Sequence, residues 1–236
     1  MAKRKKAPSQ GLNFVRNKYP YLIKTFKERR KGFHHIKEQL PFAELCNAID
    51  HLDKNLNSKF KEIIYGNPLP KSYDDLGVCE EYPYLGNSII SETNWILISI
   101  RKYTYELNLF IVYKNLFEQS LLIGDYIEAE KHLDKIEKEI CFSLWTLENR
   151  FLVKELRNES LASKELLSTF NFTNNSEGYT KTLAHFLSLR AEKALSVNRY
   201  MTDLNLSLSK IRGRNKDEHN DYYRFKLNFL NTDLFS

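Results

Sequence analysis

The second half of this sequence contains almost no residues that break helices. All six prolines lie at or before Pro83, and only three of the eight glycines follow Gly86. β-Sandwiches and barrels need many turns, and turns favour Gly and Pro, so this scarcity argues against an all-β fold. It favours long helices from about residue 88 onward. The sequence therefore predicts an all-α protein, either of stacked antiparallel helical hairpins or of an irregular helical bundle.

Cysteines and long apolar runs are also scarce. The three cysteines are isolated, and their spacing fits neither a metal site nor a disulfide framework: Cys46, Cys79 and Cys141. A reducing compartment is the simplest interpretation. Residues 1–10 have no apolar core like that of a secretory signal. We therefore expect a cytoplasmic protein, or a nuclear one if the source is eukaryotic.

The strongest apolar run covers residues 95–98 and is extended by Ile100. It is far shorter than the roughly 20 residues that cross a bilayer. We interpret it as part of the core, and we expect no transmembrane segment.

The motifs of common catalytic sites are missing as well. The sequence has no glycine loop of the Walker or Rossmann type, no serine nucleophile elbow and no HExxH pair. His34 and His35 are adjacent, so on a helix they point to different sides and rarely share an ion. We expect no cofactor and no metal site, and these absences favour a protein that binds rather than catalyses.

Positive charge is concentrated at one end of the chain. Residues 1–31 contain eleven Lys or Arg and a single acidic residue, Glu28. Aromatic residues are interleaved with these charges, a mixture that suits single-stranded nucleic acid because bases stack while phosphates pair. The candidate nucleic-acid contacts are Lys3, Arg4, Lys5, Lys6, Arg16, Lys18, Lys27, Arg29 and Arg30. The alternative is a solubilising tail whose aromatic residues fix the first helix to the body.

Glycine and proline also divide the chain. Residues 1–10 are expected to form a basic disordered tail and residues 11–66 an N-terminal helical segment. Residues 67–87 are proline-rich, lack a helical period and are expected to connect it to a helical body at 88–236. The final helix has no clear stop signal, so we expect the body to continue beyond residue 236.

Helical periodicity predicts the main elements. Pro20 and Pro41 are expected to start helices that end near Lys31 and Gly66. Further helices are expected from Ser88 and at 103–123, 126–140, 143–157, 160–170, 179–197, 200–211 and 217–231. The two-residue joint at Gly124-Asp125 predicts an antiparallel hairpin. Its second helix has an apolar stripe that we expect to be buried: Ala129, Leu133, Ile136 and Ile140.

The hairpin joint resembles the middle of a tetratricopeptide repeat. The run from Gly124 to Ala129, with Leu133 after it, places a small residue at the turn and an alanine where two helices approach closely. Tyr113 and Leu116 stand where the first helix of such a repeat presents bulky residues. The resemblance implies a protein-binding surface of stacked hairpins, formed around Tyr113, Leu116, Gly124, Tyr126 and Ala129.

Other positions depart from the repeat consensus. The residues concerned are Phe117, Ser120, Ile136 and Cys141. A shift of 33 residues brings Ala129 onto Ala162 and Leu133 onto Leu166, but it puts Arg157 where the turn glycine stood. A third hairpin is expected to centre on residues 198–200. An ordinary helical bundle that contains one such joint remains the alternative.

A second resemblance concerns residues 214–219. Arg214 and His219 fit the R-polar-x-x-x-H pattern of HEPN ribonucleases, which are all-helical. The resemblance implies that His219 acts in acid–base chemistry on RNA and that Arg214 steadies phosphate charge. Arg30 and His35 have the same separation, although Lys31 breaks the pattern.

The structural alternative for residues 214–219 is the charged first turn of a helix. The apolar and aromatic residues that follow would then face inward: Tyr222, Tyr223, Phe225, Leu227 and Leu230. We therefore predict a non-catalytic helical scaffold that binds a protein partner. A HEPN-like ribonuclease or toxin-like effector and a nucleic-acid-binding subunit are the alternatives.

Overall fold

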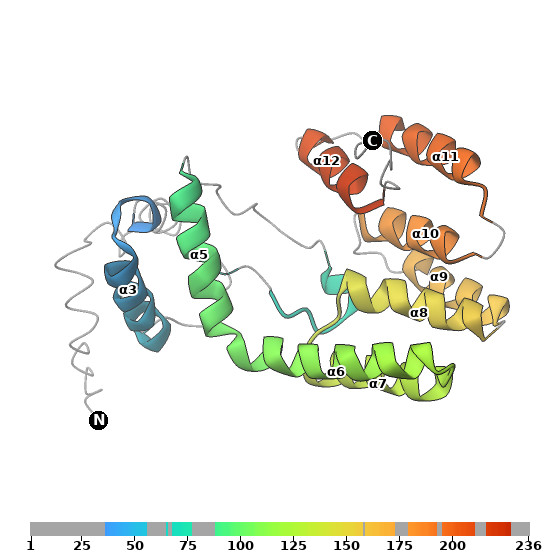
Figure 1. Ribbon diagram of the computed structural model, residues 1–236. Coiled ribbons are helices and arrows are strands. Elements are labelled where there is room, and N and C mark those ends of the chain that lie inside the picture. Colours follow the sequence, from blue (N-terminus) through green and yellow to red (C-terminus); the bar gives the residue numbers. More distant parts are fainter. Residues whose placement is uncertain are drawn as a thin grey trace, which may run out of the picture. The chain divides into compact units, whose positions relative to one another are not determined.

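A computed structural model of the chain describes residues 36–55, 65, 68–76, 88–157, 159–172, 179–192, 195–210 and 216–227. Every regular element among these residues is helical, which confirms the all-α prediction. The elements, drawn in Figure 1, are α3 (Phe42–Asn55), the 3₁₀ turn η2 (Tyr73–Asp75), α5 (Ile89–Lys102), α6 (Thr104–Leu122), α7 (Tyr126–Glu139), α8 (Leu144–Leu156), α9 (Ser160–Phe172), α10 (Tyr179–Ala191), α11 (Val197–Lys210) and α12 (Lys216–Leu227).

The described residues belong to two compact units. The first contains residues 36–55, 65, 68 and 88–108, and the second contains residues 69–76 together with the described residues from 109 onward. Contact therefore groups α5 with α3, and the division between the units lies inside α6. None of the described helices is both long and apolar enough to cross a bilayer.

In the first unit, α3 begins where the sequence predicts. Pro41 stands just before the helix and accepts the backbone hydrogen bond of Leu45 at 2.9 Å. Leu45, Ala48 and Ile49 lie on one side of α3 and are buried. The helix that the sequence predicts from Pro41 to about Gly66 is described only in part, because residues 56–64 lie outside the described residues. The helix predicted to start at Pro20 lies outside them as well.

The apolar run on α5 differs from the prediction. Ile98 is buried at 5% exposure, but Ile96, Leu97 and Ile100 are 55%, 48% and 49% exposed. The interpretation of the whole run as core is therefore wrong. Consecutive helical residues point about 100° apart, so a continuous run cannot all face one way.

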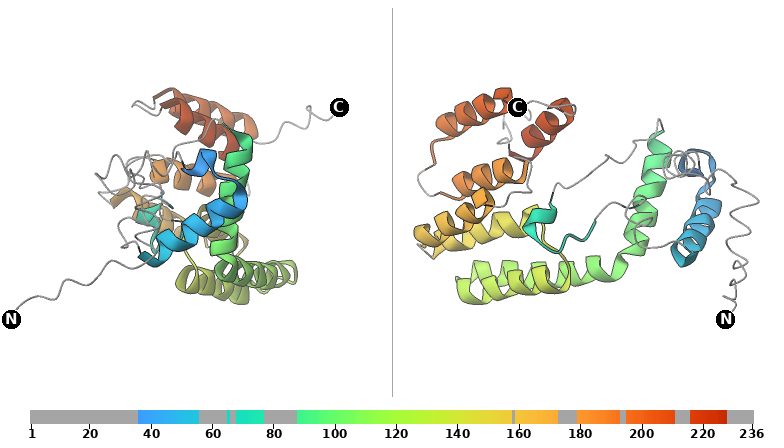
Figure 2. Two further views of the ribbon diagram at one scale, coloured as in Figure 1. Left: turned by 90° about the vertical axis from the view of Figure 1, so that its left-hand side faces the viewer. Right: turned by 180° about the vertical axis from the view of Figure 1, so that it is seen from behind.

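The α6–α7 hairpin in the second unit confirms the prediction made from its short joint. Gly124 has a φ of 82°, in the left-handed region where residues with a Cβ are strained. The Asp125 side chain then accepts the backbone N–H of Glu128 at 3.0 Å and caps α7. Near the other end, the hydroxyl of Tyr113 on α6 donates to Glu139 on α7 at 2.7 Å, so the helices run antiparallel (Figures 1 and 2).

The predicted buried stripe of this hairpin is also confirmed. Ala129, Leu133 and Ile136 have no exposed surface, and Ile140 is 3% exposed. Ala129 and Leu133 form one cluster with Phe117 of α6 and Val153 of α8. The rings of Phe110 and Phe117 meet Trp145 of α8 edge to face, with centroids 5.2 and 5.4 Å apart.

The larger core of the second unit lies among the helices from α8 to α12. Its buried residues are Leu147, Phe151, Phe170, Leu183, Ala184, Phe186, Leu187, Tyr200, Leu204, Leu208, Tyr223 and Leu227. α8 packs against α7, α9 and α10, and α10 also packs against α12. Stacked hairpins and an irregular bundle both produce such neighbours, so the choice between them stays open.

Two details of the C-terminal helices correct the predictions. α10 ends at Ala191 and α11 begins at Val197, so residues 198–200 lie in the first turn of α11 rather than at a joint. Ser196 supplies the first turn of α11, since its carbonyl oxygen accepts the N–H of Tyr200 at 2.9 Å. In α12, Tyr223 and Leu227 are buried one helical turn apart, whereas Tyr222 and Phe225 are 38% and 86% exposed and do not face inward.

Candidate protein-binding surface

The two sides of α6 in the second unit differ in how far their side chains are exposed among the described residues. Phe117 and Ser120 point into the unit and are buried. On the opposite side, Ile111 and Val112 are each 52% exposed, and Leu116 is 38% exposed. Leu116 lies one helical turn after Val112, and Ile111 points about 100° away from Val112, so the three residues belong to one broad exposed face of α6.

Further exposed aliphatic residues lie at the end of the hairpin. Leu122 and Ile123 on the α6 side are 87% and 79% exposed, and Ile127 on the α7 side is 60% exposed. Isolated exposed aliphatic residues are ordinary, but a contiguous group of them marks an interaction site. We call the six residues together the outer surface of the hairpin: Ile111, Val112, Leu116, Leu122, Ile123 and Ile127.

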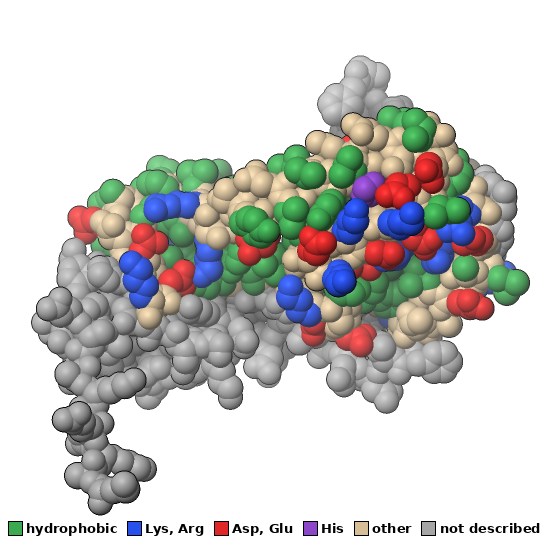
Figure 3. Space-filling model, turned by 90° about the horizontal axis from the view of Figure 1, so that it is seen from below, with side chains coloured by type: hydrophobic (Ala, Val, Ile, Leu, Met, Phe, Trp, Pro, Cys, Tyr) green, Lys and Arg blue, Asp and Glu red, His purple; other side chains and the backbone are tan. Residues whose placement is uncertain are grey.

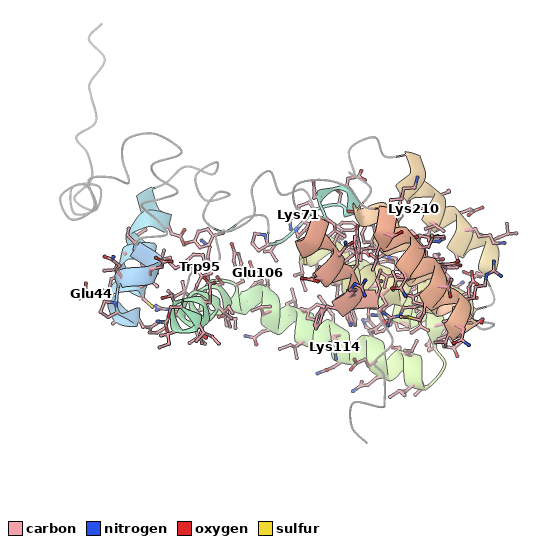
Figure 4. The ribbon with its side chains drawn as sticks, turned by 90° about the horizontal axis from the view of Figure 1, so that it is seen from above. Glu44, Lys71, Trp95, Glu106, Lys114 and Lys210 are labelled. Carbon is pink, nitrogen blue, oxygen red and sulfur yellow. The ribbon has the colours of Figure 1, made fainter. Side chains whose placement is uncertain are left out.

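Charged residues near the outer surface are paired with one another. Lys114, labelled in Figure 4, lies 2.6 Å from Glu118 on the same helix. Lys131 lies 2.7 Å from Glu128, and its hydrogen bond lowers the pKa of that carboxyl. Figure 3, which views the molecule from below, shows apolar side chains next to acidic and basic side chains. These two pairs therefore add no net charge beside the outer surface, and the carboxylate of Asp125 is exposed at the turn.

The residues predicted for the protein-binding surface have different environments. Leu116 belongs to the outer surface, and Gly124 forms the exposed turn beside it. Tyr113 is half-buried and donates a hydrogen bond to Glu139, while Tyr126 packs against the cluster around Ala129. Ala129 itself has no exposed surface, so its side chain contacts the neighbouring helices and not the solvent. Sequence patterns did not single out Ile111, Val112, Leu122, Ile123 or Ile127.

An ion-pair network around the buried carboxylate of Glu137 holds α7 on α8. Arg150, 13% exposed, donates from Nε and Nη2 to the two carboxylate oxygens of Glu137 at 2.8 and 2.5 Å, and from Nη2 to Asp134 at 2.6 Å. Burial alone would lower the pKa of Arg150, but the hydrogen bonds and charge of Glu137 outweigh it and raise that pKa above its usual range. Nearby, Arg157 lies 2.6 Å from Glu130. The sequence offered no signal for this network, because pairing across two helices depends on their packing.

Residues 69–76 form part of the second unit and complete the network. The hydroxyl of Tyr73 donates to Glu137, and burial followed by the charge of Glu137 raises the pKa of this tyrosine. Lys71 Nζ donates to the carbonyl of Ile140 at 2.9 Å, and Thr180 Oγ1 donates to the carbonyl of Leu76 at 2.6 Å. This segment, expected from sequence only as a connection, therefore ties α7, α8 and α10 together.

The other candidate sites lie mostly outside the described residues. The nine basic residues at positions 3–30, the pair Arg30 and His35, and Arg214 all do. His219 falls in the first turn of α12, which begins at Lys216 as the structural alternative expected, but its side chain is also outside the described part. The ribonuclease and nucleic-acid interpretations stay predictions.

No metal-binding cluster is found among the described side chains. No three His, Cys, Asp or Glu residues there lie close enough to hold one metal ion. His132 is 6% exposed, its Nε2 lies 3.8 Å from Glu128, and its Nδ1 has no hydrogen-bond partner among the described residues. A single buried imidazole beside one carboxylate does not by itself identify a reaction site.

Comparisons with known proteins add no relative. Protein-family models, curated proteins and solved structures were compared with this chain, and none of them matches it.

Proposed function

We propose that this protein is a non-catalytic helical scaffold that binds a protein partner on the outer surface of the α6–α7 hairpin. The observation that carries the proposal is the group of six exposed aliphatic residues defined above, five of which are at least half exposed. Burial of such apolar surface is the main favourable term in protein association.

The chemistry of the surface indicates the kind of partner. Asn115 and Gln119 are exposed on the same side of α6, and their amides can orient a partner by hydrogen bonding without adding charge. Val112 and Leu116 lie four residues apart along α6, a spacing that matches the ridges of another helix. The best fit is an amphipathic helix with an aliphatic face and few charges on that face.

Rigidity of the hairpin supports the same proposal. The Arg150–Glu137 network and the Trp145 contacts fix α6 and α7 on α8 through packing on the side away from the outer surface. A preformed surface loses little conformational entropy when a partner binds. The partner is therefore expected to bind without rearrangement of the second unit.

The experiment compares capture of partners by the tagged full-length protein and two variants. Val112→Asp/Leu116→Asp places two charges on the outer surface, and we expect it to lose the partner, with at least about a 30-fold fall in affinity. The matched control is Leu206→Asp on α11, which is 54% exposed and far from the hairpin in sequence. The partner must still be captured after the sample has been treated with nuclease. A partner retained equally by both variants contradicts the proposal.

A further inference from the structure

The two sides of α5 differ in the side chains that they present. Towards α3 and residue 65, α5 presents polar and aromatic side chains together with the buried Ile98. Glu92 pairs with Lys37 at 2.6 Å, and Lys102 pairs with Asp53 at 2.6 Å. Trp95, labelled in Figure 4, stacks on Tyr65 with ring centroids 5.6 Å apart.

The opposite side of α5 is aliphatic and exposed. Ile89, Ile90, Ile96, Leu97 and Ile100 are 82%, 69%, 55%, 48% and 49% exposed. No ionised residue interrupts this side between residues 89 and 100, because the sole acid, Glu92, is turned towards Lys37. A helix normally turns its apolar side to the core, so this arrangement indicates that a further surface covers α5.

The spacing of the exposed residues identifies what kind of surface fits. Ile89, Thr93, Ile96 and Ile100 follow one another at steps of four, three and four, which is the repeat of a coiled-coil seam. Thr93 does not interrupt the seam, since its hydroxyl already donates to the carbonyl of Ile89 at 2.8 Å and leaves its methyl group free to pack.

We propose that α5 mediates self-association of the protein by pairing with α5 of a second copy in antiparallel orientation. Centring the pair between Thr93 and Ile96 makes the seam self-complementary. Ile89 of one copy then packs against Ile100 of the other, and Thr93 packs against Ile96, with the same contacts repeated by the two-fold axis.

Electrostatics favours a second copy in this orientation. A two-fold contact places each residue of α5 against residues of the identical helix, so any charge on the seam would meet a like charge or be buried unpaired. The seam contains none. Antiparallel pairing also separates the two Arg101 side chains, which are 68% exposed and would be brought together at one end by parallel pairing.

The size of the contact predicts its strength. α5 has 14 residues, so it is about 21 Å long. That single helix offers less than the roughly 800 Å² per partner of a standard stable interface. We therefore expect a reversible dimer with a dissociation constant of about 1–100 µM at 25 °C.

Sedimentation of the full-length protein over about 1–300 µM tests the proposal, with circular dichroism to verify folding of each variant. We expect Ile96→Asp to weaken self-association at least about 30-fold, because symmetry introduces the charge twice. Thr93→Ile replaces the polar layer and should strengthen self-association about fivefold or more. The matched control, Val112→Asp on α6, should leave it unchanged, and this keeps the test separate from partner binding at the hairpin.

Cross-linking through introduced cysteines tests the orientation. An equal mixture of Ile89→Cys and Ile100→Cys proteins, treated with a short thiol-reactive cross-linker, should form a covalent dimer that neither protein forms alone. Native cysteines are the same in all samples and provide the background. A wild-type protein that stays monomeric throughout, an Ile96→Asp variant that dimerises normally, or cross-linking of each protein alone to the same extent as the mixture would overturn the proposal.

Discussion

Tyr200 of α11 donates a hydrogen bond of 2.9 Å to the carbonyl oxygen of Leu227, the last residue of α12. The final carbonyls of a helix have no partner within the helix, so a side chain from elsewhere must satisfy them when they are buried. Arg190 of α10 does the same for Lys226, at 3.0 Å. The end of α12 is thereby attached to both α10 and α11.

Removal of this tyrosine hydroxyl should destabilise the second unit. We expect Tyr200→Phe to lower its free energy of unfolding by about 1 kcal/mol, because Tyr200 is only 2% exposed and the carbonyl of Leu227 loses its donor. Urea titration monitored by fluorescence of Trp145 measures this in a Trp95→Phe background. Tyr105→Phe, at a tyrosine that is 76% exposed, is the control and should change little.

The same residue predicts a dependence on alkaline pH. Burial raises the pKa of Tyr200 to about 12, from about 10 in the unfolded chain. The contribution of the neutral phenol to the stability of the fold is complete below pH 10, because the phenol is then protonated in both the folded and the unfolded chain. It is lost between pH 10 and 12, where only the unfolded chain ionises. Wild type should therefore lose more stability than Tyr200→Phe between pH 9 and 11.5, and equal losses would contradict the assignment.

The turn at Gly124 is expected to be sensitive to any side chain. A Cβ at this position would meet no atom within 4 Å, so only the backbone conformation opposes substitution. We expect Gly124→Ala to cost about 1 kcal/mol of unfolding free energy, and Gly124→Asn to cost less, because Asn tolerates positive φ. Thermal and urea unfolding measure the difference. An alanine variant as stable as wild type would show that the φ of 82° is not required.

Removing only one partner of the Arg150–Glu137 pair should lower the free energy of unfolding substantially. Arg150→Met leaves the carboxylate of Glu137, which is 9% exposed, without a cationic partner, and we expect a loss of about 3 kcal/mol of unfolding free energy. Adding Glu137→Leu removes the buried charge and should recover most of that loss. Lys114→Met, which breaks an exposed pair, should cost less than about 0.5 kcal/mol and is the control.

Local features of the sequence were sufficient to predict much of the helical frame. The joint between the two helices is only Gly124 and Asp125, and so short a joint predicts an antiparallel pair. The apolar residues from Ala129 to Ile140 recur with a single helical period. The break between α10 and α11 was misplaced because no Gly or Pro marks it. Ser196 was the available signal, as a cap just before Val197.

The candidate surfaces could not be predicted in the same way. Ile96 and Ile100 look like core residues in the sequence, and only the contacts of α5 reveal that Trp95 and Ile98 occupy the inner side. Tyr73 and Arg150 are similar cases: their roles depend on Glu137, which lies 64 and 13 residues away along the chain. Such relationships follow from packing and not from local periodicity.

Site-specific photo-cross-linking tests partner binding at the hairpin most directly. A photoreactive residue at Val112 should form an adduct with a distinct protein in an extract of the organism's own cells. Leu116→Asp in the same chain should abolish the adduct. The same probe at Leu206, a position on α11 that is 54% exposed, should give none. Equal adducts from both probe positions, or an adduct that survives Leu116→Asp, would contradict the assignment of the outer surface as a protein-binding site.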